Sequence, residues 1–228
     1  MNDMAVIVPS RGRPSNIARL YQALKDTEAQ VDLYVGIDAD DPCVDEYKAL
    51  AKEDLHIVIS KQRERFGPTL NRISKLIYSK YDYLAWMGDD HFPRTYGWAQ
   101  RYRQELDRLK IGIVYGNDLV QGINIPTQMG FSPKIVEILG YAVPDGFIHL
   151  FIDNYFLELG KAIDGVSYLE DVIVEHLHPC VGNAEQDLTY REANSQENWT
   201  NDQRRFHDYM SEELESDAYK IITFKAKL

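Results

Sequence analysis

Short apolar runs alternate with amphipathic segments through the first ninety residues of the chain. The apolar runs are residues 6–8, 31–37, 55–60 and 83–87. Their continuous hydrophobicity is typical of strands that are buried on both faces. The segments with apolar side chains at helical spacing are residues 14–24, 44–52 and 69–79. This strict alternation of strand and helix predicts a parallel sheet with helices on both sides.

The second half of the chain has a less regular pattern. Residues 96–109 and 153–163 are predicted to be helices. A further short helix is predicted after Ser132, with Ser132 as its cap and Pro133 in its first turn. The strands predicted there are residues 111–115, 166–169 and 172–176. Glycine and proline interrupt the segment between residues 116 and 130, which predicts loops. No repeat or linker divides the pattern, so one main domain is expected.

Composition places the chain among globular proteins. It has 228 residues, of which 44% are hydrophobic, so a substantial core is expected. The apolar runs are too short to span a bilayer, and Met1 leads into a strand rather than a signal peptide, so no membrane association is expected. Two cysteines, Cys43 and Cys180, are too few for a disulfide framework. A cytoplasmic location follows, in the host cytoplasm if the chain is phage-encoded.

Charge is distributed unevenly along the chain. The formal net charge of -11 argues against a protein that coats nucleic acid with its whole surface. Two local basic clusters remain available for anions, residues 11–13 and residues 61–65. The excess of acid lies between residues 185 and 217, which we interpret as a solvated helical tail.

Gly88-Asp89-Asp90-His91 is the most informative turn, because it follows directly on the apolar run 83–87. Open α/β sheets carry their chemistry at the carboxyl ends of their strands. Adjacent carboxylates beside an imidazole can hold a divalent cation. The alternative is a solvated acidic loop or a helix cap. The apolar strand before the turn and Phe92-Pro93 after it favour a functional site.

Four segments, in this order along the chain, carry a resemblance to a known family. They are Val6-Ile7-Val8-Pro9-Ser10-Arg11-Gly12-Arg13, then Gly36-Ile37-Asp38, then residues 67–71 with residues 88–91, and finally residues 152–165 with residues 175–179. Over residues 4–180 the chain resembles the nucleotide-diphospho-sugar transferases of the GT-A fold, which are glycosyltransferases related to family 2. The resemblance implies an α/β fold with a mainly parallel central sheet flanked by helices. It implies a glycosyltransferase domain over residues 1–180 and leaves residues 181–228 as an acidic, partly helical extension, packed on that domain or trailing from it.

The resemblance also implies roles for individual residues. Those expected to contact the donor are Pro9, Ser10, Arg11, Arg13, Asp38, Arg65, Gly67, Asn71 and Asp90. Asp89 and His91 are expected as direct metal ligands, while Asp90 binds the metal, its water or the donor ribose. The family's acid-any-acid motif is replaced here by Asp-Asp-His, which matches an aspartate-any-histidine variant. This mixed donor set suits Mn²⁺ well and Mg²⁺ somewhat less.

Two further positions complete the expected site. His176 and His178 alternate along a predicted strand and should point to opposite faces, so only one can join the metal. We select His178, because it lies at the strand's end before Pro179. Asp153 is the candidate general base for the acceptor hydroxyl. The helix dipole should lower its pKa, and a plain first-turn acid is the alternative.

The function implied is metal-dependent transfer of a sugar from a nucleotide diphosphate, most simply a UDP-sugar, to an acceptor hydroxyl, with inversion preferred. The acceptor is not identified; a hydroxymethylated pyrimidine of phage DNA and a glycan are both candidates. One alternative is a sugar nucleotidyltransferase, although Ser10-Arg11-Gly12-Arg13-Pro14 is too short and too poor in glycine for that class's phosphate loop. The other is a nucleotide-sugar binding module without turnover.

Overall fold

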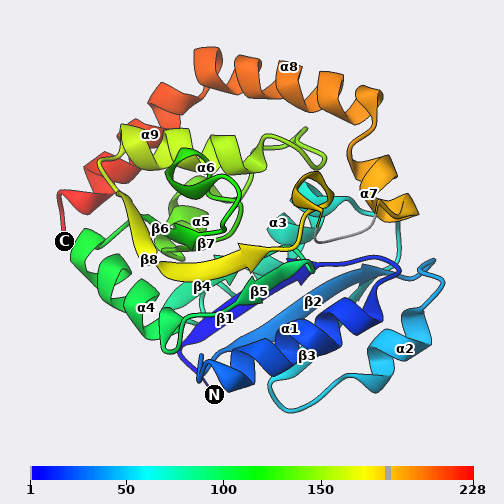
Figure 1. Cartoon of the computed structure of the whole chain (residues 1–228). Coiled ribbons are helices and arrows are strands. Elements are labelled where there is room, and N and C mark those ends of the chain that lie inside the picture. The colour runs from blue at the N-terminus through cyan, green and yellow to red at the C-terminus, as the bar shows by residue number, and fades with distance from the viewer. Residues whose placement is uncertain (1, 183–185) are drawn as a thin grey trace.

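One eight-stranded sheet, in the order β3-β2-β1-β4-β7-β6-β8-β5, forms the centre of the computed structural model, which describes residues 2–182 and 186–228 (Figure 1). The strands are β1 Met4–Pro9, β2 Asp32–Asp38, β3 Leu55–Ser60, β4 Tyr83–Trp86, β5 His91–Pro93, β6 Ile113–Asn117, β7 Met129–Phe131 and β8 Val166–His176. The helices are α1 Pro14–Asp26, α2 Val44–Ala49, α3 Phe66–Ile77, α4 Trp98–Leu109, α5 Lys134–Leu139, α6 Ile152–Ala162, α7 Leu188–Ala193, α8 Gln196–Glu212 and α9 Leu214–Lys225, with 3₁₀ turns at Gly122–Asn124 and Pro179–Val181.

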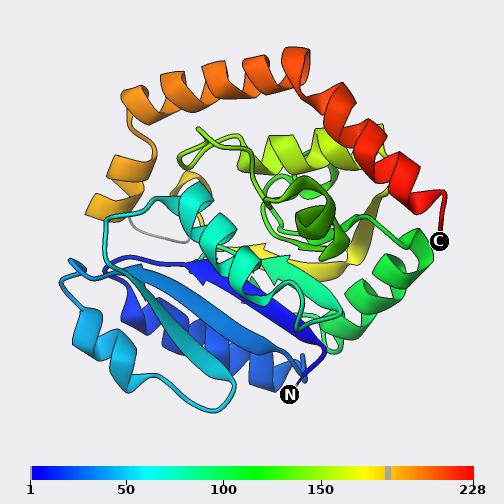
Figure 2. The same cartoon turned by 180° about the vertical axis from the view of Figure 1, so that it is seen from behind.

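The first half confirms the predicted alternation. Strands β3, β2, β1 and β4 are adjacent and parallel. The first five residues of the central strand β1 are fully buried, because their side chains alternate between two hydrophobic clusters. Met4, Val6 and Val8 pack with α1 and α4, and Ala5 and Ile7 pack with α3 and α6. The two views show α1 and α3 on opposite sides of this half of the sheet (Figures 1 and 2).

The second half differs from the prediction in its strands. β5 and β7 were not predicted, because three residues are too few to show a period. β7 lies antiparallel between β4 and β6, so the sheet is mixed beyond β4. The two strands predicted between residues 166 and 176 are one strand, β8, whose pairing with β6 shifts register after Leu169. The exposed Glu170 and Asp171 lie at this shift and break the apolar pattern without ending the strand.

The predicted cap of α5 is wrong. The helix begins at Lys134, with Pro133 in the cap position. Ser132 instead accepts a hydrogen bond from the Gly112 amide through its Oγ atom (3.1 Å). Its side chain therefore joins the loop before β6 to the end of β7.

The C-terminal segment is helical, as predicted, but the interpretation as a solvated tail is wrong. Residues 186–228 pack on the domain: α8 arches over α6, and α9 lies beside α6 and α5 (Figures 1 and 2). Tyr209 and Ile221 belong to the same hydrophobic cluster as Ile7 of the central strand. Even two carboxylates of this acidic segment, Asp202 and Asp217, are buried. Within the described residues, no helix combines the length and the apolar composition needed to cross a membrane.

Candidate active site

A cavity of about 340 Å³ lies where β1, β2 and β4 end, and the turn that follows β4 forms part of its wall. Of the site residues predicted from the sequence, all but Gly67 and Asn71 line this cavity. Segments from the second half complete the wall, among them residues 149–153 before and within α6, and Thr189, Tyr190, Glu192 and Ala193 of α7. The topology thus brings together residues that are far apart in the sequence.

Gly67 and Asn71 do not line the cavity, which corrects their expected place. Helix α3 begins at Phe66 rather than near residue 69, so both lie inside the helix. The Asn71 side chain accepts hydrogen bonds from the amides of Ala142 and Val143 (2.8 and 2.9 Å). The Gly67 amide donates to the Ile148 carbonyl (3.1 Å). Both residues therefore hold neighbouring loops.

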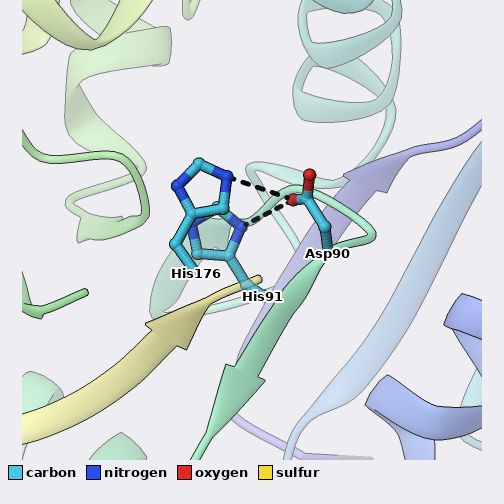
Figure 3. Close-up of side chains that lie close together, drawn as sticks. All are labelled: Asp90, His91 and His176. Atoms are coloured by element: carbon cyan, nitrogen blue, oxygen red, sulfur yellow. Dashed lines mark ion pairs between the residues drawn. The ribbon is translucent and has the colours of Figure 1, made fainter. Parts of the chain in front are cut away.

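Three side chains form a group that can hold a metal ion, Asp90, His91 and His176, with ligand atoms within 4.8 Å of one another (Figure 3). Asp90 Oδ1 lies 3.3 Å from His91 Nδ1 and 3.6 Å from His176 Nε2. The antiparallel pairing of β5 with β8 places His91 directly opposite His176, and the two rings stack with centroids 4.3 Å apart. Two imidazoles and a carboxylate are a donor set that suits a divalent transition metal.

Asp118, which the sequence analysis missed, lies on the side of the ring nitrogens of His91 and His176 that do not face Asp90. His91 Nε2 lies 3.3 Å from Thr127 Oγ1, and the Thr127 hydroxyl donates to Asp118 Oδ2 (2.8 Å). The same oxygen is 4.0 Å from His176 Nδ1. Buried carboxylates in this position fix the ring orientation of metal-binding histidines. The available signal was its place directly after β6, at a strand's carboxyl end.

His91 has the features that a metal-binding histidine needs. Burial, followed by the neighbouring His176, lowers the pKa of His91 below its ordinary value. Its Nδ1 atom accepts a hydrogen bond from the Gly88 amide (3.1 Å), so this nitrogen carries a lone pair. Burial would raise the pKa of Asp90, but its contacts with His176 and His91 hold this pKa well below the usual range.

Asp89 lies apart from this group, although the sequence analysis expected it as a direct ligand. Its Oδ2 accepts a hydrogen bond from the Ser10 hydroxyl (2.6 Å), and its Oδ1 pairs with Arg13 (3.0 Å). Burial and then the Asp90 carboxylate raise the pKa of Asp89 to about 6, against the opposing charge of Arg13. The structure thus places Asp90, rather than Asp89, beside His91 and His176.

The expected choice between His176 and His178 is wrong in its premise. β8 ends at His176, so the strand alternation does not extend to His178. The two rings lie 4.8 Å apart, and both line the cavity. His178 also makes an edge contact with Tyr190 of α7, with ring centroids 5.4 Å apart. The ligand group contains His176, and His178 lies next to it.

Asp153 lies in the first turn of α6 and faces the cavity. Burial raises its pKa above the ordinary value, and this outweighs the hydrogen bond that its Oδ1 accepts from the Asn154 amide (2.8 Å). The backbone amides at the helix N-terminus lower this pKa, in the predicted direction, but burial outweighs them and the net shift is upward. A carboxylate with a raised pKa is better suited to accept a proton.

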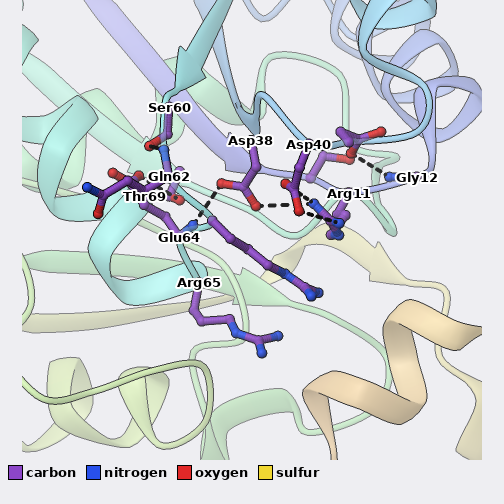
Figure 4. Close-up of polar contacts among 12 residues, drawn as sticks. Arg11, Gly12, Asp38, Asp40, Ser60, Gln62, Glu64, Arg65 and Thr69 are labelled. Atoms are coloured by element: carbon purple, nitrogen blue, oxygen red, sulfur yellow. Dashed lines mark hydrogen bonds and ion pairs between the residues drawn. The ribbon is translucent and has the colours of Figure 1, made fainter.

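The basic clusters are paired with carboxylates. Arg11 binds Asp40 (2.9 Å) and approaches Asp38 (3.4 Å), whose other oxygen accepts from the Glu64 amide (Figure 4). Arg13 makes two hydrogen bonds of 2.6 Å to Asp187 at the start of α7.

The second basic cluster meets α7 as well. Arg63 and Arg65 both bind Glu192, each with a 2.5 Å hydrogen bond. Asp187 and Glu192, both from the C-terminal segment, thus neutralise arginines at the cavity. The acidic segment that the sequence presents as a tail is therefore part of the site's charge balance.

Comparison with known proteins agrees with this architecture. The model of glycosyl transferase family 2 matches residues 5–138. The mannosyltransferase PcManGT from Pyrobaculum calidifontis, solved with GDP-Man and Mn²⁺, superposes with a TM-score of 0.62 at 12% identity, over 99% of this chain and 75% of that one. TarS from S. aureus superposes with a TM-score of 0.57 at 14% identity, over 76% of this chain and 36% of that one, so this chain spans about a third of TarS. A search of curated proteins gives no match.

Proposed function

The chain belongs to glycosyl transferase family 2, and from this premise we propose that it transfers a sugar from a nucleoside diphosphate donor, a UDP-sugar first among them, to an acceptor hydroxyl. One observation carries the proposal. A single cavity at the carboxyl edge of the sheet contains a metal-binding group, arginines and a buried carboxylate that can act as a base. These are the parts that displacement of a diphosphate requires.

Asp90, His91 and His176 would hold the cation, with His178 next to them. When bound, the cation supplies positive charge to the diphosphate as it leaves. Two nitrogen ligands and one carboxylate favour Mn²⁺ over Mg²⁺, which prefers oxygen. PcManGT was solved in complex with Mn²⁺, which is in keeping with this preference.

The remaining roles follow from where the side chains lie. Arg13 and Arg65 line the cavity and can offer guanidinium groups to the diphosphate in competition with their carboxylate partners. We assign Asp38, at the end of β2, to contact with the base or ribose. Asp153 takes the proton of the acceptor hydroxyl while that oxygen attacks the anomeric carbon and the bond to the diphosphate breaks. One such displacement inverts the configuration at the anomeric carbon, so we propose an inverting transfer.

For the acceptor, we propose a glycan rather than a DNA base. Binding of DNA depends on free cationic side chains along the phosphate backbone. Here Arg13, Arg63 and Arg65 are paired with carboxylates of the C-terminal segment. The cytoplasmic location expected from the sequence stays a prediction.

The test is turnover with a panel of nucleotide sugars. The purified protein with Mn²⁺ should release nucleoside diphosphate from one donor, by slow hydrolysis or by transfer to added glycans, and EDTA should abolish this release. Affinity for UDP without release from any donor would identify a binding module instead. Formation of pyrophosphate from a nucleoside triphosphate and a sugar phosphate would identify a nucleotidyltransferase, and either result would refute the proposal.

A further inference from the structure

Asp202 of α8 is fully buried, although it belongs to an acidic segment whose sequence suggests exposure to solvent. Its Oδ1 accepts a hydrogen bond from the Ile148 amide (2.8 Å), and its Oδ2 accepts from the amides of His149 (2.8 Å) and Leu150 (2.7 Å). One carboxylate therefore binds three consecutive backbone amides. Three hydrogen bonds to one buried side chain fix this segment firmly.

The segment held by Asp202 leads directly into the helix that carries the proposed base. Residues 149–153 all line the cavity, and α6 begins at Ile152. His149 reaches the cavity beside Phe66, with ring centroids 5.6 Å apart, and burial keeps its pKa below the ordinary value. Asp153 follows four residues later. A shift of this backbone would therefore move both side chains together.

The same face of α8 holds the turn at Phe151. Phe151 has a φ of 61°, in the left-handed region of the backbone that residues other than glycine rarely adopt. Its ring packs on Trp199 and Phe206 of α8, with centroids 5.1 and 5.8 Å away. Trp199, Asp202 and Phe206 recur at helical spacing and so share one face. An unfavourable backbone conformation persists only where its surroundings enforce it, and α8 supplies those surroundings.

We infer that Asp202 is a positioning residue for the proposed transfer: through the amides of residues 148–150 it sets the place of Asp153 and His149 in the cavity. This inference rests on the proposed function. Asp202 lies outside residues 5–138, where the family model matches, so the role belongs to the C-terminal segment. It is a role in catalysis rather than in donor binding, because the metal-binding group and the arginines lie on other elements.

The test compares Asp202→Asn with the matched control Asp217→Asn. Asp217 is also a buried carboxylate of the C-terminal helices, but it accepts hydrogen bonds from Tyr141 and Lys220 and does not line the cavity. Asp202→Asn leaves a single acceptor oxygen for three amides. Three quantities are measured on the full chain: hydrogen exchange of the peptide covering residues 146–153, the Kd of UDP with Mn²⁺, and the steady-state kcat and KM for the donor.

We expect Asp202→Asn to speed exchange in residues 148–152 and to lower kcat by about tenfold or more, with the Kd of UDP and the donor KM changed by less than about threefold. Asp217→Asn should leave kcat and that exchange unchanged, even if its melting temperature falls. In an Asp153→Asn background, Asp202→Asn should lower kcat little further, because it acts through Asp153.

Failure of the positioning role and failure of the proposed function give different results. If the wild type turns over a donor and Asp202→Asn is as active as Asp217→Asn, the positioning role is refuted and the proposed function stands. The same conclusion follows if Asp202→Asn weakens UDP binding and leaves kcat intact. If the wild type turns over no donor, the proposed function itself is refuted, and the positioning role falls with it.

Discussion

Replacement of Glu192 by glutamine should strengthen the binding of the donor's diphosphate. Glu192 lies on α7 and binds both Arg63 and Arg65 at the cavity. Burial would raise its pKa, but these two guanidinium groups lower it, so the side chain is a carboxylate at neutral pH. A diphosphate that approaches the two arginines must compete with this carboxylate. The amide of glutamine has the same shape and no charge.

The size of the effect follows from the exposure of the two ion pairs that Glu192 makes. The Glu192 side chain is 40% exposed, and those of Arg63 and Arg65 are each 37% exposed, so solvent screens both contacts. Ion pairs of this kind contribute about 0–1 kcal/mol each. Removal of the competing charge should therefore favour the diphosphate by about 1 kcal/mol, which corresponds to roughly fivefold tighter binding. The gain should shrink in high salt, where the screening length falls to about 3 Å at 1 M.

Isothermal titration of UDP with Mn²⁺ measures this change, at low and at high salt. Glu197→Gln on α8 is the matched control, because it removes the same charge from an exposed position of the C-terminal segment that does not line the cavity. Unchanged or weaker binding of UDP by Glu192→Gln would refute the reasoning. An equal gain in Glu197→Gln would also refute it, because the effect would then be one of net charge.

Three other substitutions test the site and the fold. Asp90→Asn should abolish the Mn²⁺-dependent part of UDP binding with little change in melting temperature, and retained dependence in titrations would place the metal elsewhere. Asp153→Asn should lower kcat by about 10²–10⁴ with an unchanged Kd for UDP. In the wild type, kcat/KM should fall on the acid side at a pH above 3.8, because burial raises the pKa of this base, which must be deprotonated to act; a limb at or below 3.8 would contradict the assignment. Ile221→Ala should cost about 2–5 kcal/mol in urea unfolding, because this α9 side chain is fully buried in the main core, and a loss well under 1 kcal/mol would show that α9 adds little to that core.

The sequence by itself determined the parallel half of the fold and the edge where the site lies. Strands buried on both faces need continuous apolar runs, and residues 6–8 and 83–87 display this pattern without any tertiary information. Parallel strands all end at the same edge, so the polar residues that follow them had to meet there. For this reason Arg13, Asp38 and His91 line one cavity although they come from three separate segments.

Only the tertiary structure decided which side chains face one another. His176 joins His91 because β5 and β8 pair antiparallel, and a strand of three residues leaves no period to read. The buried Asp202 and the arginine partner Glu192 come from a segment that looks solvated in sequence, since it carries an excess of acidic residues. Pairing between segments more than a hundred residues apart depends on how the chain closes on itself, and no local pattern of polarity encodes that.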